Sequence, residues 1–254
     1  MSIAIEPIKR NLDFYTVDDL PESDGKPMAE THDHVLQMVA ALDPLLWHYR
    51  DEPDLYLIGN MFVYFLDKND KLQRVAPDIF AVRGVSKEKR RVYYVAQEGK
   101  APEVVIEFTS RKTRKVDLYQ KPDIYSWLGV SEYFMFDPLG DYLKPRLIGF
   151  KLVRGKYVQM DKTKPRLHSN VLGLDLVTEG NRLRFYDSRT GEKLLTHEEA
   201  QAARQLAEAQ AQREAKARQT AETKAQRAVA AQQVAEAEMA RLREDLARLQ
   251  KRDR

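Results

Sequence analysis

Short apolar runs separated by turn residues follow one another along the chain between residues 54 and 187. They are rich in Val, Ile, Tyr and Phe, which is typical of β-strands. We expect strands within residues 54–59, 60–67, 77–83, 90–96, 102–110 and 131–138. Residues 68–73 have the composition of a turn. Two hairpins should follow, turning at Arg154-Gly155-Lys156 and at Gly180-Asn181.

Two segments instead repeat apolar residues every three to four positions, which predicts helices. The first covers residues 34–48, after a cap at Thr31 or Asp33. The second covers residues 115–128, and Gly129 is well placed to end it. The order of helix, strands, helix and strands predicts an α+β fold with a mixed sheet.

The composition changes sharply near residue 195. After Gly191 the chain contains no glycine, proline or aromatic residue, and from His197 it is almost entirely Ala, Glu, Gln, Arg and Lys with a few aliphatic residues. That composition is typical of a long solvated helix. We therefore expect two parts, a globular domain at residues 1–195 and a helical tail at residues 196–254.

The tail carries a pattern of apolar residues on alternating steps of three and four, as in the seam of a coiled coil. Its members are Leu249, Leu246, Leu242, Met239, Ala235, Ala228, Ala225 and Ala221. Gln232 interrupts this seam, and alanine buries little area, so the predicted assembly is weak. The pattern predicts a homo-oligomer, through the tail or through the sheet domain, and a solvated single helix is the alternative.

Composition excludes several other kinds of protein. The absence of cysteine rules out disulfides, thiolate zinc sites and thiol nucleophiles. No run of about 18 apolar residues predicts a membrane span, and the N-terminus lacks the apolar core of a signal peptide, so we expect a cytoplasmic protein without membrane contact. The net charge of +3 argues neither for nor against nucleic acid. Two local basic runs, residues 87–91 and 111–115, are either solvated loops or phosphate contacts.

A glutamate inside an apolar strand is the first candidate for chemistry. Glu107 lies within Val-Val-Ile-Glu-Phe, where its carboxylate loses hydration unless a cation, a metal or hydrogen bonds replace the water. Asp78 raises the same question, because it follows Pro77 and opens another apolar run. Asp78 alone could simply finish a turn. Two carboxylates on neighbouring strands, however, favour Mg²⁺ or Mn²⁺ and phosphodiester hydrolysis.

Several segments resemble the bacterial Uma-two family of restriction endonucleases, within the PD-(D/E)XK nuclease superfamily. The resembling segments are residues 76–85, 99–138, 142–152, 172–176 and 183–196. The resemblance covers roughly residues 14 to 200, and residues 103–138 are its most specific part. It implies a restriction-endonuclease-like core, a mixed sheet flanked by helices, with a divalent metal at the ends of two strands.

The resemblance places the metal-binding acids on Asp78 and Glu107. The usual superfamily lysine would stand two positions after the glutamate, where this chain has Thr109. In the Uma-two pattern a lysine on the following helix replaces it, within a D-x-x-x-K-x-x-x-Y spacing that matches Asp117, Lys121 and Tyr125. Steps of four place these three residues on one helical face. An ordinary surface pair between Asp117 and Lys121 is the alternative.

Pro122 bears on this assignment, because proline removes one intrahelical bond and disfavours helical geometry in the residue before it. Either the helix bends there or its main part starts at Pro122. Glu30, just before the first helix, is a candidate auxiliary acid near the metal. His32 and His34 lie two positions apart, which does not place them on one helical face, so the sequence does not favour a paired metal role.

These residues predict a divalent-metal-dependent DNA endonuclease. Asp78, Glu107 and Lys121 are the predicted catalytic residues, and the two acids would hold Mg²⁺ or Mn²⁺. DNA is the expected partner, with Arg111, Lys112 and Arg114 as candidate contacts to its backbone. The alternative is a catalytically idle nuclease fold that serves as a binding or assembly module through its coiled coil.

Overall fold

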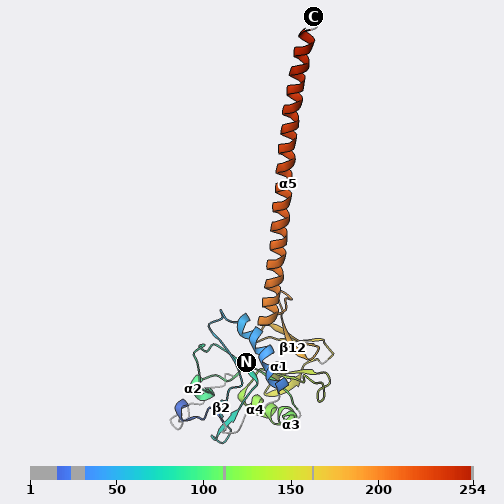
Figure 1. Ribbon diagram of the computed structural model, residues 1–254. Helices are drawn as coiled ribbons and strands as arrows, with labels where there is room; N and C mark the ends of the chain where they lie inside the picture. Colours follow the sequence, from blue (N-terminus) through green and yellow to red (C-terminus); the bar gives the residue numbers. More distant parts are fainter. Residues whose placement is uncertain (1–15, 24–31, 111–112, 162, 253–254) are drawn as a thin grey trace. The chain divides into compact units, whose positions relative to one another are not determined.

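A computed structural model describes residues 16–23, 32–110, 113–161 and 163–252. The chain divides into two compact units, Met1–His197 and Glu198–Arg254. Figure 1 shows the elements in chain order. The first unit is built on a six-stranded mixed sheet with the order β1-β4-β6-β7-β8-β9. Its strands are β1 (Leu55–Gly59), β4 (Ile79–Arg83), β6 (Val104–Phe108), β7 (Glu132–Phe136), β8 (Leu147–Val153) and β9 (Lys156–Gln159).

Two three-stranded sheets and short helices complete this unit. One sheet contains β10 (Arg166–Ser169), β11 (Leu174–Glu179) and β12 (Arg182–Asp187), and the other contains β2 (Val63–Leu66), β3 (Leu72–Val75) and β5 (Tyr93–Tyr94). The helical elements are η1 (Val17–Asp19), α1 (His32–His48), α2 (Val95–Glu98), α3 (Arg114–Tyr119) and α4 (Lys121–Leu128). Together these elements confirm the predicted α+β fold with a mixed sheet.

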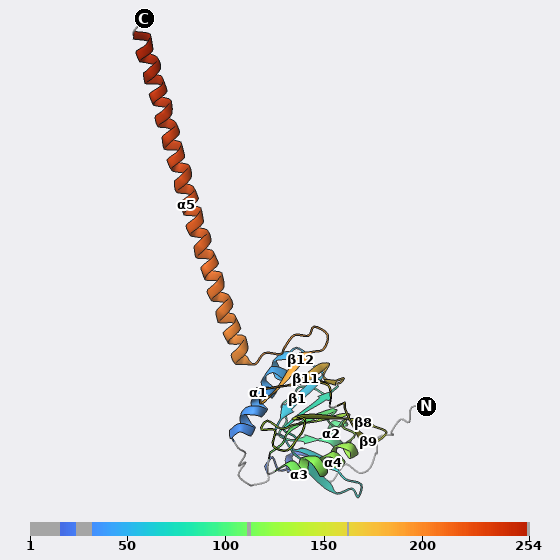
Figure 2. The ribbon, with the colours of Figure 1, turned by 90° about the vertical axis from the view of Figure 1, so that its right-hand side faces the viewer.

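The large sheet is buried on both faces, which explains why its inner strands are almost continuously apolar. Ile106 of β6 joins a hydrophobic core with Leu45 of α1 and Leu176 of β11. Val105, which points to the opposite face, joins a second core with Tyr125 of α4. Figure 2 shows α1 on one side of the sheet and α3 and α4 on the other. Residues of odd and even number in β6 therefore face different helices.

Strands β6 and β7 are parallel, and α3 and α4 form the crossover between them. The helical segment predicted over residues 115–128 is divided at Gln120, close to the alternative in which its main part starts at Pro122. The physical reason is Pro122, which has no N–H to continue the hydrogen-bond ladder. The new helix begins at Lys121, with Pro122 in its first turn, where a proline is tolerated. As expected, Gly129 ends it with a positive φ of 78°.

The hairpin predictions are confirmed. Arg154 and Gly155 connect β8 to β9 with φ values of 51° and 75°, as a two-residue type I′ turn requires. Gly180 and Asn181 connect β11 to β12. The predictions missed β3, which starts inside the expected turn, and β10. They also assigned Val95 to a strand, whereas it begins α2.

The second unit is occupied by the long helix α5 (His197–Arg252). Of the predicted seam residues, Met239 and Leu242 are exposed, with 54% and 55% of their surface accessible. The side chains of Leu246 and Leu249 lie outside the described part of the chain. The coiled-coil seam stays a prediction. Within the described residues, no helix combines the length and apolar character needed to cross a membrane.

Candidate active site

Asp78 and Glu107 lie side by side on neighbouring strands of the large sheet. Strands β4 and β6 are antiparallel, with Ile79 opposite Ile106, so the residue before β4 stands beside Glu107. The Asp78 N–H donates to Glu107 Oε2 at 3.3 Å, and the Phe108 N–H donates to Asp78 Oδ2 at 2.7 Å. The sheet register thus brings together the two acids that the sequence singled out.

Glu107 is fully buried on the face of the sheet that α3 and α4 cover. Its Oε1 atom accepts a hydrogen bond from the Tyr125 hydroxyl at 2.5 Å and lies 2.8 Å from Lys121 Nζ. Both partners come from α4, one turn apart. A buried ammonium and a phenol therefore compensate the carboxylate, which answers how an acid can stand within this strand.

Asp117 of α3 is the third carboxylate of the site, and it is almost completely buried. Its Oδ1 atom lies 3.0 Å from Lys121 Nζ. Neither carboxylate oxygen has a partner with hydrogen-bond geometry in the structure, so the contact with Lys121 is an ion pair alone. Since Lys121 is only 13% exposed, the alternative of an ordinary surface pair is wrong.

His34 is a member of the site that the sequence did not indicate. Its Nε2 atom lies 3.1 Å from Asp78 Oδ1, and its ring meets Phe108 edge-on at 6.3 Å between centroids. In the sequence, His34 stood out only as half of a possible metal-binding pair with His32, which is exposed at the start of α1. No local pattern could have indicated this contact, because only the packing of α1 on the sheet brings its first turn to Asp78, 44 positions away in the chain.

Position 109, where the superfamily lysine usually stands, supplies no cation. The Thr109 N–H donates to the Phe136 carbonyl at 2.8 Å, and its hydroxyl lies 3.4 Å from the same oxygen. Among the predicted DNA contacts, Arg114 lies over the Tyr142 ring, with 5.0 Å between its guanidinium carbon and the ring centroid. The other predicted contacts and the predicted auxiliary acid lie outside the described residues, namely Arg111, Lys112 and Glu30.

The buried charges shift one another's pKa values. Burial raises the pKa of Glu107 to about 8, and the Lys121 ammonium opposes this shift without cancelling it. Burial acts in the same direction on Asp78, but the hydrogen bond and charge of His34, with the charge of Lys121, outweigh it and hold the pKa of Asp78 below its usual range. Burial would lower the pKa of Lys121, yet Glu107 and Asp117 raise it, so this lysine stays charged.

These shifts predict how stability depends on pH in a chelating buffer. Folded Glu107 keeps its proton up to about pH 8, whereas the unfolded side chain loses it near pH 4.5. The folded state therefore binds more protons in this window, and stability falls as the pH rises. Between pH 6 and pH 8 the loss due to Glu107 is on the order of 2 kcal/mol. The opposite contribution of Asp78 is lost only near or below its ordinary pKa of 3.8, outside this range.

Urea unfolding of the parent and of Glu107→Gln at several pH values between 6 and 8 measures this dependence. We expect the fall in the free energy of unfolding with rising pH that Glu107 causes to be absent from the variant. The same slope in both proteins would show that Glu107 does not hold its proton in the folded state.

Comparison with known proteins now identifies the family. The model of the Uma2 family, described as "Putative restriction endonuclease", matches residues 22–179. The chain belongs to the Uma2 family. The matched residues include Asp78, Glu107, Lys121 and His34, so the whole candidate site lies within the Uma2 domain. The resemblance inferred from the sequence is therefore confirmed.

The comparison with curated proteins gave no match. One similar solved structure is described as "a putative nuclease belonging to DUF820 from Anabaena variabilis ATCC 29413". It is 14% identical, and the match covers 62% of this chain and 90% of that chain, with a TM-score of 0.43.

Proposed function

We propose that this Uma2 protein is a divalent-metal-dependent endonuclease that hydrolyses phosphodiester bonds in DNA. The observation that carries the proposal is the pairing of Asp78 and Glu107 on adjacent strands, with the Lys121 ammonium beside Glu107. Membership of a family described as restriction endonucleases supports the same chemistry. Asp78 and Glu107 are the proposed metal ligands, and Lys121 is the proposed catalytic cation.

The donor set fits a hard divalent cation. Within the described residues, no group of three or more His, Cys, Asp or Glu side chains is arranged to hold a metal ion. Mg²⁺ does not require such a cage, because it commonly binds one or two carboxylates and completes its shell with water and substrate phosphate. The Asp117 carboxyl group, which shares Lys121 with Glu107, adds a third acid beside the two proposed ligands. Among its described residues, the site therefore holds three acids, Asp78, Glu107 and Asp117, and one lysine.

When bound, Mg²⁺ or Mn²⁺ supplies Lewis-acid polarisation of a phosphoryl oxygen and lowers the pKa of a water molecule. The chain's own residues prepare the site for this chemistry. His34 and the Phe108 N–H hold the two oxygens of Asp78 in place. The Tyr125 hydroxyl fixes Glu107 in the same way. Preorganised ligands of this kind avoid reorganisation cost during the reaction.

Lys121 places a positive charge of the chain's own beside the proposed metal ligands. Its Nζ atom lies between Glu107 and Asp117, at the end of the sheet where Asp78 and Glu107 meet. An ammonium held there can stabilise the negative charge that develops on a phosphoryl group in the transition state. Arg114, at the start of α3, is the described residue that we propose as a contact to the DNA backbone.

A catalytically idle module is the second candidate, and one contact favours it. Lys121 Nζ lies 2.8 Å from Glu107 Oε1, a contact that a purely structural ion pair would also make. If this second candidate is right, the site binds no metal, and the protein serves as a binding or assembly module.

Cleavage of supercoiled plasmid DNA with Mg²⁺ or Mn²⁺, and with chelator as the control, distinguishes the two candidates. Calorimetric titration with Mn²⁺ provides a second measurement that does not depend on the DNA sequence. We expect nicking or linearisation with metal and a heat of Mn²⁺ binding. Absence of both would favour the idle module.

We also propose that α5 mediates homo-oligomerisation. A chain that ends at His197, the last residue of the first compact unit, is expected to keep its fold. Its rate of DNA cleavage per molecule should stay within about twofold of the full-length rate, because every proposed site residue precedes His197. Light scattering should report fewer chains per particle than for the full-length protein, and circular dichroism should report the fold. An unfolded truncated chain would show that α5 stabilises the first unit.

A further inference from the structure

Strand β1 forms one edge of the six-stranded sheet and pairs only with β4 among the described strands. The Gly84 N–H donates to the Asp54 carbonyl, and the Asn60 N–H donates to the Asp78 carbonyl. In an antiparallel ladder, residues alternate between facing the partner strand and facing away. Leu55, Leu57 and Gly59 therefore direct their N–H and C=O groups away from β4, toward the free edge.

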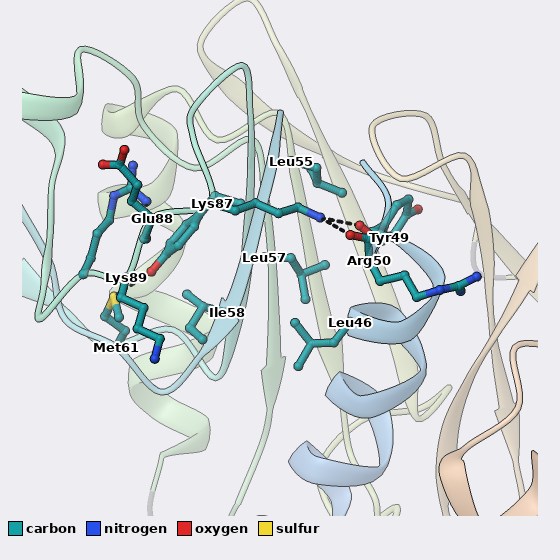
Figure 3. Close-up of a pocket in the computed structure, with 12 residues that line it drawn as sticks. Leu46, Tyr49, Arg50, Leu55, Leu57, Ile58, Met61, Lys87, Glu88 and Lys89 are labelled. Carbon is teal, nitrogen blue, oxygen red and sulfur yellow. Dashed lines mark hydrogen bonds between the residues drawn. The ribbon is translucent and has the colours of Figure 1, made fainter. Parts of the chain in front are cut away.

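A cavity of about 480 Å³ runs along this edge. Figure 3 shows it in front of β1, with Leu55 and Leu57 pointing toward α1 and Ile58 pointing to the opposite side. The lining residues are Leu46, Tyr49, Arg50, Leu55, Tyr56, Leu57, Ile58, Met61, Lys87, Glu88, Lys89 and Arg90. Four consecutive strand residues line a cavity from both faces only when the cavity lies against the strand edge. The edge is therefore a groove lined by apolar residues of α1 and β1 and by the charged residues 87–90.

We propose that the β1 edge pairs with the β1 edge of a second copy of this chain, antiparallel and centred on Leu57. In this register Leu57 faces Leu57 of the second copy, and Leu55 faces its Gly59. All of these residues direct their backbone groups toward the free edge, so each outward N–H meets an outward C=O. Self-pairing in this register leaves no outward group of Leu55, Leu57 or Gly59 without a partner, which few other registers achieve.

The apolar surface next to the groove supports the same occupant. Leu46 and Trp47 of α1 are 44% and 65% exposed, and Leu46 lines the groove itself. On the other face, Tyr56 of one copy would stand beside Ile58 of the other. Aromatic and β-branched cross-strand pairs of this kind stabilise antiparallel sheets. The exposed apolar side chains of α1 thus extend the contact beyond the two strands.

The charges at the two ends of the groove are complementary under a two-fold axis. The segment before β1 is exposed and carries Asp54, together with Asp51 and Glu52, which pair with Arg50 and Arg83 of the same copy. Figure 3 shows Lys89 near Met61 and Ile58, at the other end of the strand. Antiparallel pairing brings the Lys89 end of one copy to the Asp54 end of the other. A parallel arrangement would not bring these opposite charges together.

Lys87 sets a condition on this pairing. Its side chain crosses the groove near Leu55, and its Nζ atom donates to the carbonyls of Tyr49 and Arg50 at the end of α1. Lysines over a sheet edge limit uncontrolled association. Because it crosses the groove, the Lys87 side chain must leave these carbonyls when the edges pair.

Disulfide cross-linking of single-cysteine variants tests the register, because the chain contains no cysteine. On the two-fold axis, Leu57→Cys places two thiols across a ladder pair about 5.5 Å apart between Cα atoms, within the range that a disulfide spans. Leu55→Cys is the matched control on the same strand and face. In this register its two copies are about 14 Å apart, too far to bridge.

Mild oxidation of the full-length variants is expected to give at least tenfold more covalent dimer for Leu57→Cys than for Leu55→Cys. Association through α5 affects both variants equally. Circular dichroism confirms that each variant is folded. The proposed pairing would be overturned by equal yields from the two variants or by the absence of dimer from a folded Leu57→Cys protein. The same two results are expected if the groove binds a different partner.

Charge reversal provides a second test that leaves the strand intact. In the Leu57→Cys background, Lys89→Glu should lower the yield of dimer at least threefold, because it faces the acidic end of the second copy. Adding Asp54→Lys should restore the yield, since both contacts are then reversed together. A loss without restoration would contradict the proposed register.

Discussion

Replacing Glu107 by Gln is expected to reduce metal-dependent DNA cleavage by at least about 10³-fold, with the protein still folded. Glu107 is one of only two proposed metal ligands, and an amide oxygen carries no charge to hold a divalent cation. Glutamine retains the shape of the side chain, so it can still accept from Tyr125, which donates to Glu107 Oε1 in the parent. Single-turnover cleavage of plasmid DNA with Mn²⁺ measures the loss.

Glu132→Gln is the matched control for this substitution. Glu132 is a buried glutamate on the neighbouring strand β7, where it accepts from the Ser169 hydroxyl and from the Asn170 N–H. It has no contact with the candidate site in the structure. We expect the control to lower stability while leaving cleavage per folded molecule unchanged. A Glu107→Gln variant that cleaves like the parent would remove this residue from the proposed mechanism.

Replacing Lys121 by Met is expected to lower both cleavage and stability. A cation placed at the developing charge contributes about 10² to 10³ in rate, so the single-turnover rate should fall by at least about tenfold even if water partly substitutes. The substitution also leaves the buried carboxylates of Glu107 and Asp117 without their ammonium. Removing one partner of a buried ion pair costs about 3 to 5 kcal/mol, so unfolding in chelating buffer at pH 8 should require markedly less urea.

Two further measurements separate the loss of stability caused by the missing Lys121 charge from a simple loss of packing. The stability deficit of Lys121→Met should grow as the pH rises above about 8, because Glu107 of the parent then gives up its proton beside the ammonium, whereas Glu107 of the variant must keep it. It should shrink on addition of Mn²⁺, because a metal cation would neutralise the same acids. Lys151→Met is the control, since Lys151 lies 3.9 Å from the buried Glu132 and is more exposed. Cleavage at the parent rate by Lys121→Met would make this lysine a structural residue and favour the idle module.

The local pattern of the sequence was sufficient for most of the fold. The nearly continuous apolar runs of β4, β6 and β7 reflect burial on both faces of the sheet, which inner strands of such a sheet must satisfy. The turn at Arg154 and Gly155 follows from local backbone preference. An acid inside the β6 run is costly wherever the strand is buried, so Glu107 could be singled out before any neighbour was known.

Tertiary structure alone decided which groups compensate that acid. His34 reaches Asp78 because α1 packs on the sheet with its first turn beside β4, a long-range contact that no local pattern encodes. Lys121 faces Glu107 although the helix is divided at Gln120, because α3 and α4 both pack against the same sheet face. The free edge of β1 likewise depends on strand order, which local propensity does not specify. The sequence by itself determined the strands and the unusual acids, whereas packing between distant elements determined their partners and the surfaces left open.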